Sequence, residues 1–402
     1  MIYVQIGWVD YSKDERNKIL NILRLLGAQG ALDELGIGTV RDGFSNLLFP
    51  GISTLQTRAK YFVLLPYLFG DALKQKFIRP GDVRVWLEKQ EVALVDTLLR
   101  NSLSGAEGII GSRTYRQGRT VKMKPSAIYW SGLRTMGIFR YPELSLDDAC
   151  RETYLQSIKR REISLKTEGE EGAKDDADAL HDGHVLFSPI APPNGYMKEA
   201  KIELTQEEAE YLFTHITSNK STKGSLLGYM LAHHLMYPSF QEIEHSSLPA
   251  PLSNQVRLAQ DFSRFIYGAH LLYNVIFSQG TSFVEDFAEW RRDEFNPIDI
   301  SAIAGATHCP PHTKTFLQNW QLLMMDYQQG RDQKAAKQLI IDREKFVKGD
   351  RAKLNKPDRY RYERPVYDQR LSYRYGTVKR IMLDIYNGLE KCYGQDFAES
   401  GK

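Results

Sequence analysis

The chain has 402 residues, of which 42% are hydrophobic and 26% charged, so it is long enough for two or three domains that each bury a core, and its composition is that of a folded protein. The formal net charge of +3 is small, but the charge is unevenly distributed. Three widely spaced cysteines argue against a disulfide framework and indicate a reducing compartment. Because the sequence has no signal peptide and no run of roughly 18 apolar residues, we expect a cytoplasmic protein without membrane contact.

The first 70 residues contain one predicted strand and two predicted helices. Residues 2–9 alternate and are rich in β-branched and aromatic side chains, which predicts a short strand. A capping box at Ser12 predicts a helix. A second capping box, Ser53-Thr54-Leu55-Gln56, predicts that another helix begins at Ser53. Pro66 is expected to kink or end that helix near Leu64.

The rest of the chain shows mainly helical periodicity. A third capping box, Thr205-Gln206-Glu207-Glu208, predicts one helix start, and proline at the first helical position predicts two more. We therefore predict a mainly α protein with minor β content, organised as a multi-domain helical protein. The expected helices begin at Pro80, Pro125 and Thr205, and cover residues 254–277, 313–327, 331–346 and 377–393.

A basic segment extends from Gly108 to Tyr141, with seven Lys or Arg and no acidic residue. The helix predicted at Pro80, the turn region after it and the helix predicted at Pro125 give a helix, a turn and a second helix preceded by basic residues, which is typical of a helix-turn-helix or winged-helix-like, DNA-reading subdomain. An ordinary small helical subdomain would give the same pattern. The first candidate nucleic-acid contacts are Arg113, Arg116, Arg119, Lys122 and Lys124.

Residues 168–184 reverse this charge, with seven acidic residues against one lysine. Such a run buries too little apolar surface to order itself, so we predict a linker or solvated loop. The alternative is an intramolecular mimic of nucleic-acid charge that shields the basic segment. The predicted organisation is an N-terminal helical module at 1–162 with a basic, helix-turn-helix-like segment, an acidic linker or loop at 163–186, and a helical C-terminal module at 187–402 with a basic segment rich in Tyr and Arg.

A second basic segment, Arg343 to Arg380, has thirteen Lys or Arg against five acidic residues, with five interleaved tyrosines. Cations can neutralise phosphates while aromatic rings stack on exposed bases, so this composition suits single-stranded or distorted nucleic acid. An acidic protein partner is one alternative. A solvated loop whose tyrosines pack on the protein body is another. The second set of candidate contacts is Lys356, Arg359, Tyr360, Arg361 and Tyr362.

The sequence contains no complete motif for catalysis or metal binding. His308-Cys309-Pro310-Pro311-His312 lacks the further ligands of a structural zinc site, and no phosphate loop, dinucleotide fingerprint, serine elbow or zinc-protease motif occurs. We therefore predict no metal, no cofactor and no catalytic residue. Asp33, Glu34 and Asp42 could hold Mg²⁺ in a nuclease, but turn and helix capping is the expected role.

Several long phrases in a fixed order carry a family resemblance. Through them the chain resembles a bacterial family of uncharacterised proteins, over the first 140 residues closely and over the second half loosely. The phrases are Gly7–Ser12, Asp33–Gly38, Arg41-Asp42, Leu48–Gly51, Ser53–Phe62, Glu107–Gly111 and Ser126–Leu133.

The resemblance implies a function that the residues alone do not. Members of the family have no assigned enzymatic activity and occur among bacterial antiviral defence genes, often near a large helicase. It therefore implies a non-enzymatic accessory component of a multi-gene anti-phage system, of Druantia type, with products of neighbouring genes or a helicase as partners. With the basic segments, the expected function is binding of nucleic acid, DNA in particular, or of the helicase. The alternatives are a metal-dependent nuclease subunit and a protein-only scaffold.

Overall fold

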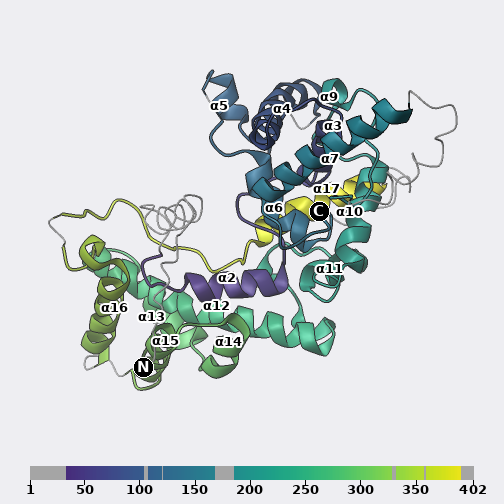
Figure 1. Ribbon diagram of the computed structural model, residues 1–402. Helices are drawn as coiled ribbons and strands as arrows, with labels where there is room; N and C mark the ends of the chain where they lie inside the picture. Colours follow the sequence, from purple (N-terminus) through teal and green to yellow (C-terminus); the bar gives the residue numbers. More distant parts are fainter. Residues whose placement is uncertain are drawn as a thin grey trace, which may run out of the picture. The chain divides into compact units, whose positions relative to one another are not determined.

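The computed structural model describes residues 33–103, 107–119, 121–167, 185–327, 332–356 and 359–390 (Figure 1). The strand predicted at residues 2–9, the helix predicted after Ser12 and residues 168–184 of the acidic linker lie outside them. The described residues are mainly α-helical, which confirms the predicted fold class. Their β structure consists of one antiparallel bridge, between Phe139 and Phe187. No helix among them has the length and apolar composition needed to cross a bilayer.

The chain forms two compact units, and neither is continuous in sequence. The first unit comprises residues 1–44 and 257–371, and the second comprises residues 45–256 and 372–402. Two of the three boundaries fall within helices, α2 (Gly38–Leu48) and α12 (Ala250–Phe277), and the third lies between Leu371 and Ser372, before α17. The sequence led us to expect modules that follow one another at 1–162 and 187–402, whereas each compact unit draws on both ends of the chain.

The remaining helices divide between the units. The first unit contains α13 (Val284–Glu289), the π-helix η3 (Trp290–Glu294), α14 (Ile300–Thr307), α15 (Pro311–Met325), α16 (Asp332–Lys348) and the 3-10 helix η4 (Gly349–Arg351). The second unit contains α3 (Tyr61–Ala72), α4 (Pro80–Asn101), α5 (Ser112–Arg116), α6 (Pro125–Thr135), α7 (Leu146–Thr167), α9 (Tyr196–Glu199), α10 (Gln206–Ser218), α11 (Leu226–Ala232), α17 (Tyr375–Glu390) and two 3-10 turns, η1 (Phe240–Glu242) and η2 (His245–Ser247).

The predicted helix starts are right at three places and wrong at one. α4 and α6 begin at their prolines, and α10 has the predicted capping box, in which Thr205 and Glu208 accept each other's backbone N–H groups. The helix predicted from Ser53 instead begins at Tyr61, and Pro66 lies inside it without ending it. α7 continues to Thr167, so the first residues assigned to the linker are helical.

Residues 53–60 form an ordered loop because side chains satisfy its backbone. Gln56 accepts the Ser53 N–H at 3.1 Å, as in a capping box, but its amide donates back to the Gly51 carbonyl at 3.0 Å. The Tyr129 hydroxyl of α6 accepts the N–H groups of Thr57 and Arg58 at 2.7 and 3.0 Å. The Gln56 half of the capping pattern is therefore present, but the next two N–H groups, of Thr57 and Arg58, are accepted by a side chain of α6, and the helix begins only at Tyr61.

The second unit is built around α3, which is buried along almost its whole length and packs against α4, α6 and α7. Its Phe69 joins an aromatic cluster with Trp130, Phe139 and Phe187, with ring centroids 4.5 to 6.3 Å apart. The β bridge holds two members of this cluster together. A helix that is apolar on all sides, as α3 is, can only be stable when neighbours cover it completely.

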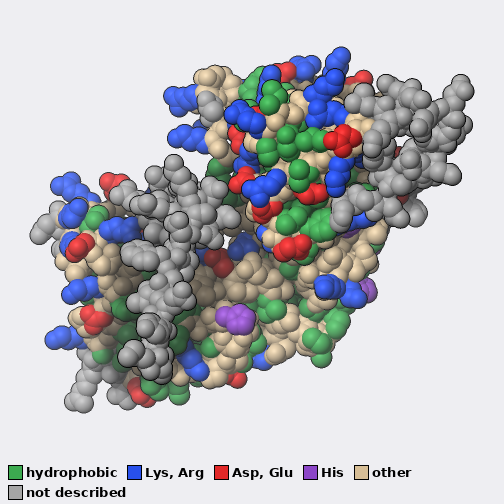
Figure 2. All heavy atoms as spheres, viewed as in Figure 1, with side chains coloured by type: hydrophobic (Ala, Val, Ile, Leu, Met, Phe, Trp, Pro, Cys, Tyr) green, Lys and Arg blue, Asp and Glu red, His purple; other side chains and the backbone are tan. Residues whose placement is uncertain are grey.

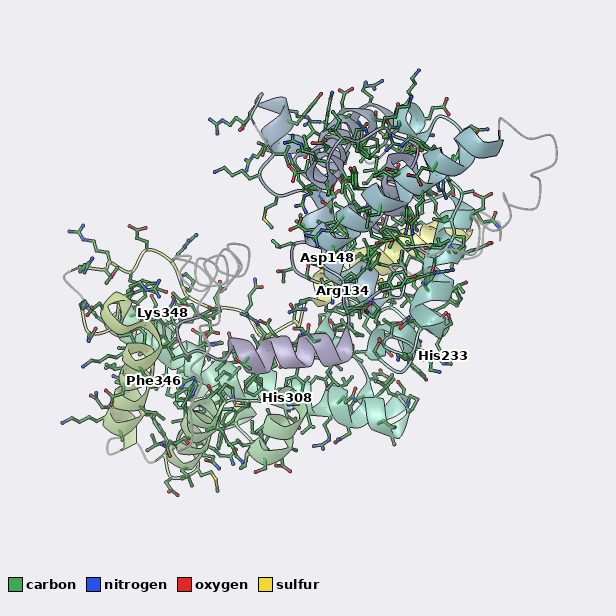
Figure 3. The ribbon with its side chains drawn as sticks, viewed as in Figure 1. Arg134, Asp148, His233, His308, Phe346 and Lys348 are labelled. Carbon is green, nitrogen blue, oxygen red and sulfur yellow. The ribbon has the colours of Figure 1, made fainter. Side chains whose placement is uncertain are left out.

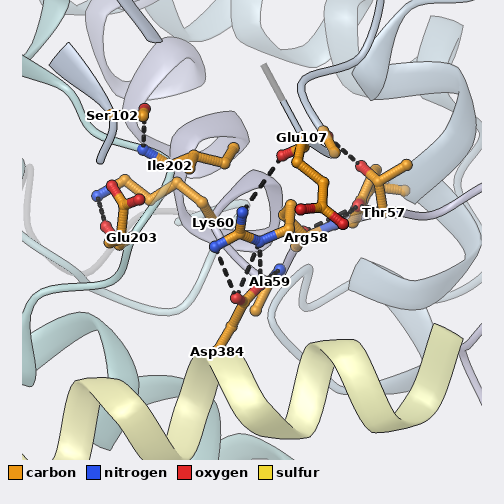
Figure 4. A network of polar contacts seen from close by, with 11 residues as sticks. Thr57, Arg58, Ala59, Lys60, Ser102, Glu107, Ile202, Glu203 and Asp384 are labelled. Carbon is orange, nitrogen blue, oxygen red and sulfur yellow. Dashed lines mark hydrogen bonds and ion pairs between the residues drawn. The ribbon is translucent and has the colours of Figure 1, made fainter. Parts of the chain in front are cut away.

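Two buried ion pairs connect the loop before α3 to distant parts of the same unit, and Figure 4 shows the one between Arg58 and Asp384. The Arg58 guanidinium binds the Asp384 carboxylate of α17 with N–O distances of 2.9 Å, and the same carboxylate accepts the Ala59 N–H at 2.8 Å. The Lys60 ammonium lies 2.6 Å from the Glu208 carboxylate at the start of α10. Both pairs are almost fully buried, and α10 also packs against α17. They therefore fix the loop, α10 and α17 to one another.

The first unit is organised around two stacked tryptophans. The rings of Trp290 and Trp320 lie 6.1 Å apart at an interplanar angle of 21°, and the Trp290 indole donates to the Arg264 carbonyl at 2.9 Å. Trp290 lies directly over Gly268 of α12, where any Cβ atom would collide with the indole. The glycine thus allows α12 and η3 to approach closely.

We expect that Lys60→Ala will strongly destabilise the second unit, because it leaves the Glu208 carboxylate buried without its cation. Loss of one partner of a buried pair typically costs about 3 to 5 kcal/mol. The measurement is the free energy of unfolding in urea. Lys74→Ala is the matched control, since its ammonium lies 2.8 Å from Asp71 but the lysine side chain is 65% exposed. The control should change stability by less than about 1 kcal/mol, and equal effects of the two substitutions would contradict the assignment.

Candidate nucleic-acid interface

The first set of predicted contacts lies on an exposed segment of the second unit, residues 108–124, which we call the basic arm. Its helix α5 has five residues, none of them buried, and follows Gly111, whose φ of +81° suits glycine. Arg113, Arg116, Arg119 and Lys122 are exposed, and Lys124 is half-buried. Figure 2 shows Lys and Arg side chains gathered where α5 lies in Figure 1.

Both ends of the basic arm are fixed to the body of the unit. At its start, the Thr57 hydroxyl donates to the Gly108 carbonyl at 2.6 Å, and the Ile110 N–H donates to the Tyr61 hydroxyl at 2.9 Å. At its end, Val121 is buried, and the arm leads into α6, where the Ser126 N–H donates to the Glu91 carboxylate of α4 at 2.5 Å. The cations between these points are therefore presented on a tethered loop with defined ends.

The basic arm differs from the predicted winged-helix-like subdomain. The two helices of the predicted motif are α4 and α6, but residues 102–124, which include α5, separate them in the chain, whereas a helix-turn-helix motif joins its helices by a short turn. In the described residues, the β pairing after α6 is the bridge at Phe139 and Phe187, without a hairpin wing. Any DNA contact would be made by the arm's cations and not by a recognition helix.

The exposed cations of the basic arm have no acidic partner among the described residues. Within the described part of the chain, Arg113, Arg116, Arg119 and Lys122 form no ion pair, although other exposed arginines of the second unit do. Arg100 pairs with Asp96 at 2.9 Å and Arg79 with Asp82 at 3.5 Å. Unpaired, clustered cations create a positive potential that paired ones largely cancel.

A buried carboxylate binds the N-terminus of α6, the helix that follows the basic arm. Glu91 of α4 is 3% exposed, and its carboxylate accepts the Ser126 N–H at 2.5 Å and the Ser126 hydroxyl at 3.1 Å. A negative group at this position also suits the N-terminus of a helix. Burial nevertheless raises the pKa of Glu91 from 4.5 to about 7, with the bonds to Ser126 opposing the rise.

The second set of predicted contacts lies in the first unit and is less accessible. Arg359 and Arg361 are exposed, and the Arg359 guanidinium lies 5.6 Å from the ring of Tyr360. The Lys356 ammonium donates to the Asp350 carbonyl, and Tyr362 packs its edge on Phe277 with ring centroids 5.4 Å apart.

The other tyrosines of this segment also face the protein. Tyr367 stacks on the fully buried His270 at 4.8 Å, and Tyr373 and Tyr375 are buried. Burial lowers the pKa of His270 to about 3, so this imidazole is neutral in the folded protein. Of the interpretations considered for this segment, tyrosines that pack on the protein body describe these rings best.

The carboxylates considered for a nuclease are already engaged. Asp33 accepts the Ile37 N–H at 3.0 Å, Glu34 lies 3.1 Å from the Lys353 ammonium, and Asp42 lies 3.3 Å from the Arg41 guanidinium. Desolvation raises the pKa of Asp33. Among the described residues, no three His, Cys, Asp or Glu side chains come together as metal ligands. His308 ends α14 in a left-handed conformation, and His312 lies in the first turn of α15.

A cavity of about 300 Å³ adjoins the Lys60–Glu208 pair between α3, α9 and α10. The Tyr67 hydroxyl donates to Glu208 at 3.3 Å, and the nearby Tyr196 hydroxyl donates to Asp71 at 2.8 Å. Its principal polar groups therefore already bond to one another, as expected of a structural network.

Residues 1–288 match the profile of a family described as "Family of unknown function (DUF6361)". The chain belongs to this family. No curated protein matches it, and no solved structure does. The match includes the basic arm, Arg58, Lys60 and Glu208, whereas Asp384 and the second set of basic residues lie beyond it.

We expect the Glu91 carboxylate to make stability pH-dependent. Since its pKa is higher in the folded than in the unfolded chain, its stabilising contribution is complete below pH 4.5 and is lost as pH rises to about 7. The loss should amount to about 3 kcal/mol. Glu91→Gln can keep both bonds to Ser126 but carries no titrating charge. As pH rises from 4.5 to about 7, the free energy of unfolding of the variant minus that of wild type should therefore increase. A difference that does not vary with pH would contradict the assignment.

Proposed function

We propose that this protein is a non-enzymatic component of a bacterial antiviral defence system that binds DNA through the basic arm. The observation that carries the proposal is the group of four exposed cations, Arg113, Arg116, Arg119 and Lys122, with no ion pair among the described residues. The defence role and a helicase or another neighbouring gene product as partner rest on the family resemblance described above. A cytoplasmic location, inferred from the sequence, belongs to the same proposal.

The arm has the physical properties that binding to phosphates requires. Arginine donates several N–H groups in a planar fork that matches a phosphate, and Arg113 and Arg116 lie three residues apart, on one side of α5. Glycines at both ends of α5 let the chain turn sharply, so that Arg119 and Lys122 follow the same short loop. Contacts of this kind read backbone charge and not base sequence.

We expect Arg113→Ala/Arg116→Ala/Arg119→Ala to weaken binding to duplex DNA and to lower its salt dependence. Each phosphate that the variant no longer neutralises should reduce the slope of log K against log salt by roughly 0.9. The measurement is fluorescence anisotropy of labelled DNA over a series of salt concentrations with Mg²⁺ present. The same samples are then run on a denaturing gel.

The matched control is Arg79→Ala/Arg100→Ala/Arg151→Ala, which removes the same charge from exposed arginines of the second unit that pair with carboxylates. It should leave the salt slope unchanged. An equal loss of affinity in both triple variants would show that binding follows net charge and not the arm. Wild-type protein that binds no DNA at low salt would overturn the proposal, and Mg²⁺-dependent shortening of the DNA would show a nuclease.

A further inference from the structure

A groove of about 390 Å³ lies between α15 and α16, two helices of the first unit that pack against each other. Its walls combine aromatic rings with polar groups. The rings are those of His312, Phe316 and Phe346, and the polar groups include Thr315, Asn319 and Asp342. The volume is within the range of small-molecule sites.

Phe346 is the unusual residue in the groove. It is 67% exposed, although most of the protein's phenylalanines are buried. Figure 3 labels it on α16, close to Lys348. Its ring centroid lies 5.2 Å from that of His312, at an angle of 49°. An exposed phenylalanine costs free energy in water, which an additional ring stacked on its open face would recover.

The inner side of this aromatic platform is fixed by Arg343. Its guanidinium lies 5.8 Å from the centre of the Phe346 ring and 4.9 Å from that of Phe316. The same guanidinium donates to the Leu35 carbonyl at 2.7 Å and to the Thr313 hydroxyl at 2.8 Å. A cation held in this way orients the ring before any ligand binds, which lowers the entropic cost of stacking.

The polar groups of the groove suit the edge of a heteroaromatic ring. The Asn319 amide can donate and accept, whereas the Asp342 carboxylate only accepts. Its Oδ1 atom accepts the Gln338 amide at 2.9 Å, which orients the carboxylate. A carboxylate favours a ring that presents an amino group, as cytosine does through N4, and disfavours one that presents a carbonyl oxygen there.

The charge of the two helices suits a polyanion. α15 carries Lys314, and α16 carries Lys334, Lys337 and Lys345, and within the described residues none of the four forms an ion pair. Lys334 and Lys345 are exposed. Aromatic rings combined with unpaired cations on the same helices are what proteins use to hold single-stranded nucleic acid.

We propose that the α15–α16 groove binds an unpaired nucleobase carrying an exocyclic amino group, such as cytosine in single-stranded DNA, with the base stacked on Phe346. This inference rests on the proposed function and adds a second, base-dependent contact to the phosphate contacts of the basic arm. Asp342 accepts the hydrogen bond from the amino group of the base.

The test compares a labelled oligodeoxycytidine strand with an abasic strand of the same length and phosphate number. Wild-type protein should bind the base-bearing strand more tightly by roughly 5- to 150-fold, the factor expected for one stacked base. Phe346→Ala should remove most of this ratio, while Phe346→Tyr should preserve it. Val284→Ala, an exposed apolar residue of α13 in the same unit, is the control and should leave the ratio unchanged.

A separate substitution, Asp342→Asn, tests the predicted preference for a base with an amino group. Wild-type protein should bind oligodeoxycytidine more tightly than oligothymidine, and Asp342→Asn should abolish this preference while keeping the preference over the abasic strand. A base-to-abasic ratio that survives Phe346→Ala would overturn the assignment of the groove.

The same binding measurements distinguish failure of the groove proposal from failure of the proposal for the basic arm. The triple arm variant should weaken binding of base-bearing and abasic strands by the same factor, so its base-to-abasic ratio stays at the wild-type value. Cytidine monophosphate probes the groove without the arm, because broadening of its base and ribose proton signals reports binding of the free nucleotide. Ribose 5-phosphate, which lacks the base, is the control, and its ribose proton signals should not broaden. Broadening that disappears in Phe346→Ala would support the groove even if no strand bound to the arm. No broadening, together with no base-to-abasic ratio, would overturn the groove even if the arm bound DNA.

Discussion

The structure of the second unit depends on charges that are buried in pairs. Arg58 and Lys60 lie two residues apart in a loop, yet their cationic groups bind Asp384 and Glu208, which are 326 and 148 residues away in sequence. An ion pair in the interior gains little over apolar packing, but removing one partner is very costly. The pairs therefore specify which loop meets which helices more than they add stability. Glu208 has two roles: its carboxylate binds the Lys60 ammonium, and it also accepts the Thr205 N–H and so caps α10.

Local patterns predicted most of the helices because the physics of a helix terminus is local. Proline at a first helical position gave the starts of α4 and α6, and a reciprocal cap gave that of α10. The same cap sequence at Ser53 failed because Gln56 bonds back to Gly51 and the neighbouring N–H groups are taken by Tyr129. Nothing near Ser53 in the sequence identifies that partner. A sign of the long-range pairs was present, however: Asp384 lies among the apolar residues of α17, a position that an acidic side chain rarely occupies unpaired.

Charge runs predicted the basic arm but not the conformation of the second basic segment. A run without carboxylates, as at residues 108–124, contains no acidic partner of its own, and its exposed cations also find none elsewhere in the described residues. In the second segment the interleaved tyrosines suggested stacking on bases, whereas Tyr362, Tyr367 and Tyr373 stack on the protein's own rings. Phe346, which is open to solvent, was missed because a single phenylalanine in a helix is typical of a core position. Only the structure, in which the Phe346 side chain is 67% exposed, shows that this phenylalanine is not part of the core.

The Arg58–Asp384 pair also bears on how the protein is made. The ribosome completes residues 45–256 long before it adds α17, so for much of synthesis the Arg58 guanidinium and the Ala59 N–H lack the carboxylate that binds them in the finished molecule. Contacts this distant in sequence form late and slowly. The second unit can reach its final packing only after Asp384 has left the ribosomal tunnel, and a chain truncated before α17 would expose the surface of α10 that α17 covers. α17 thus closes the second unit, since the Arg58 guanidinium gains the Asp384 carboxylate, and this face of α10 is covered, only once α17 is present.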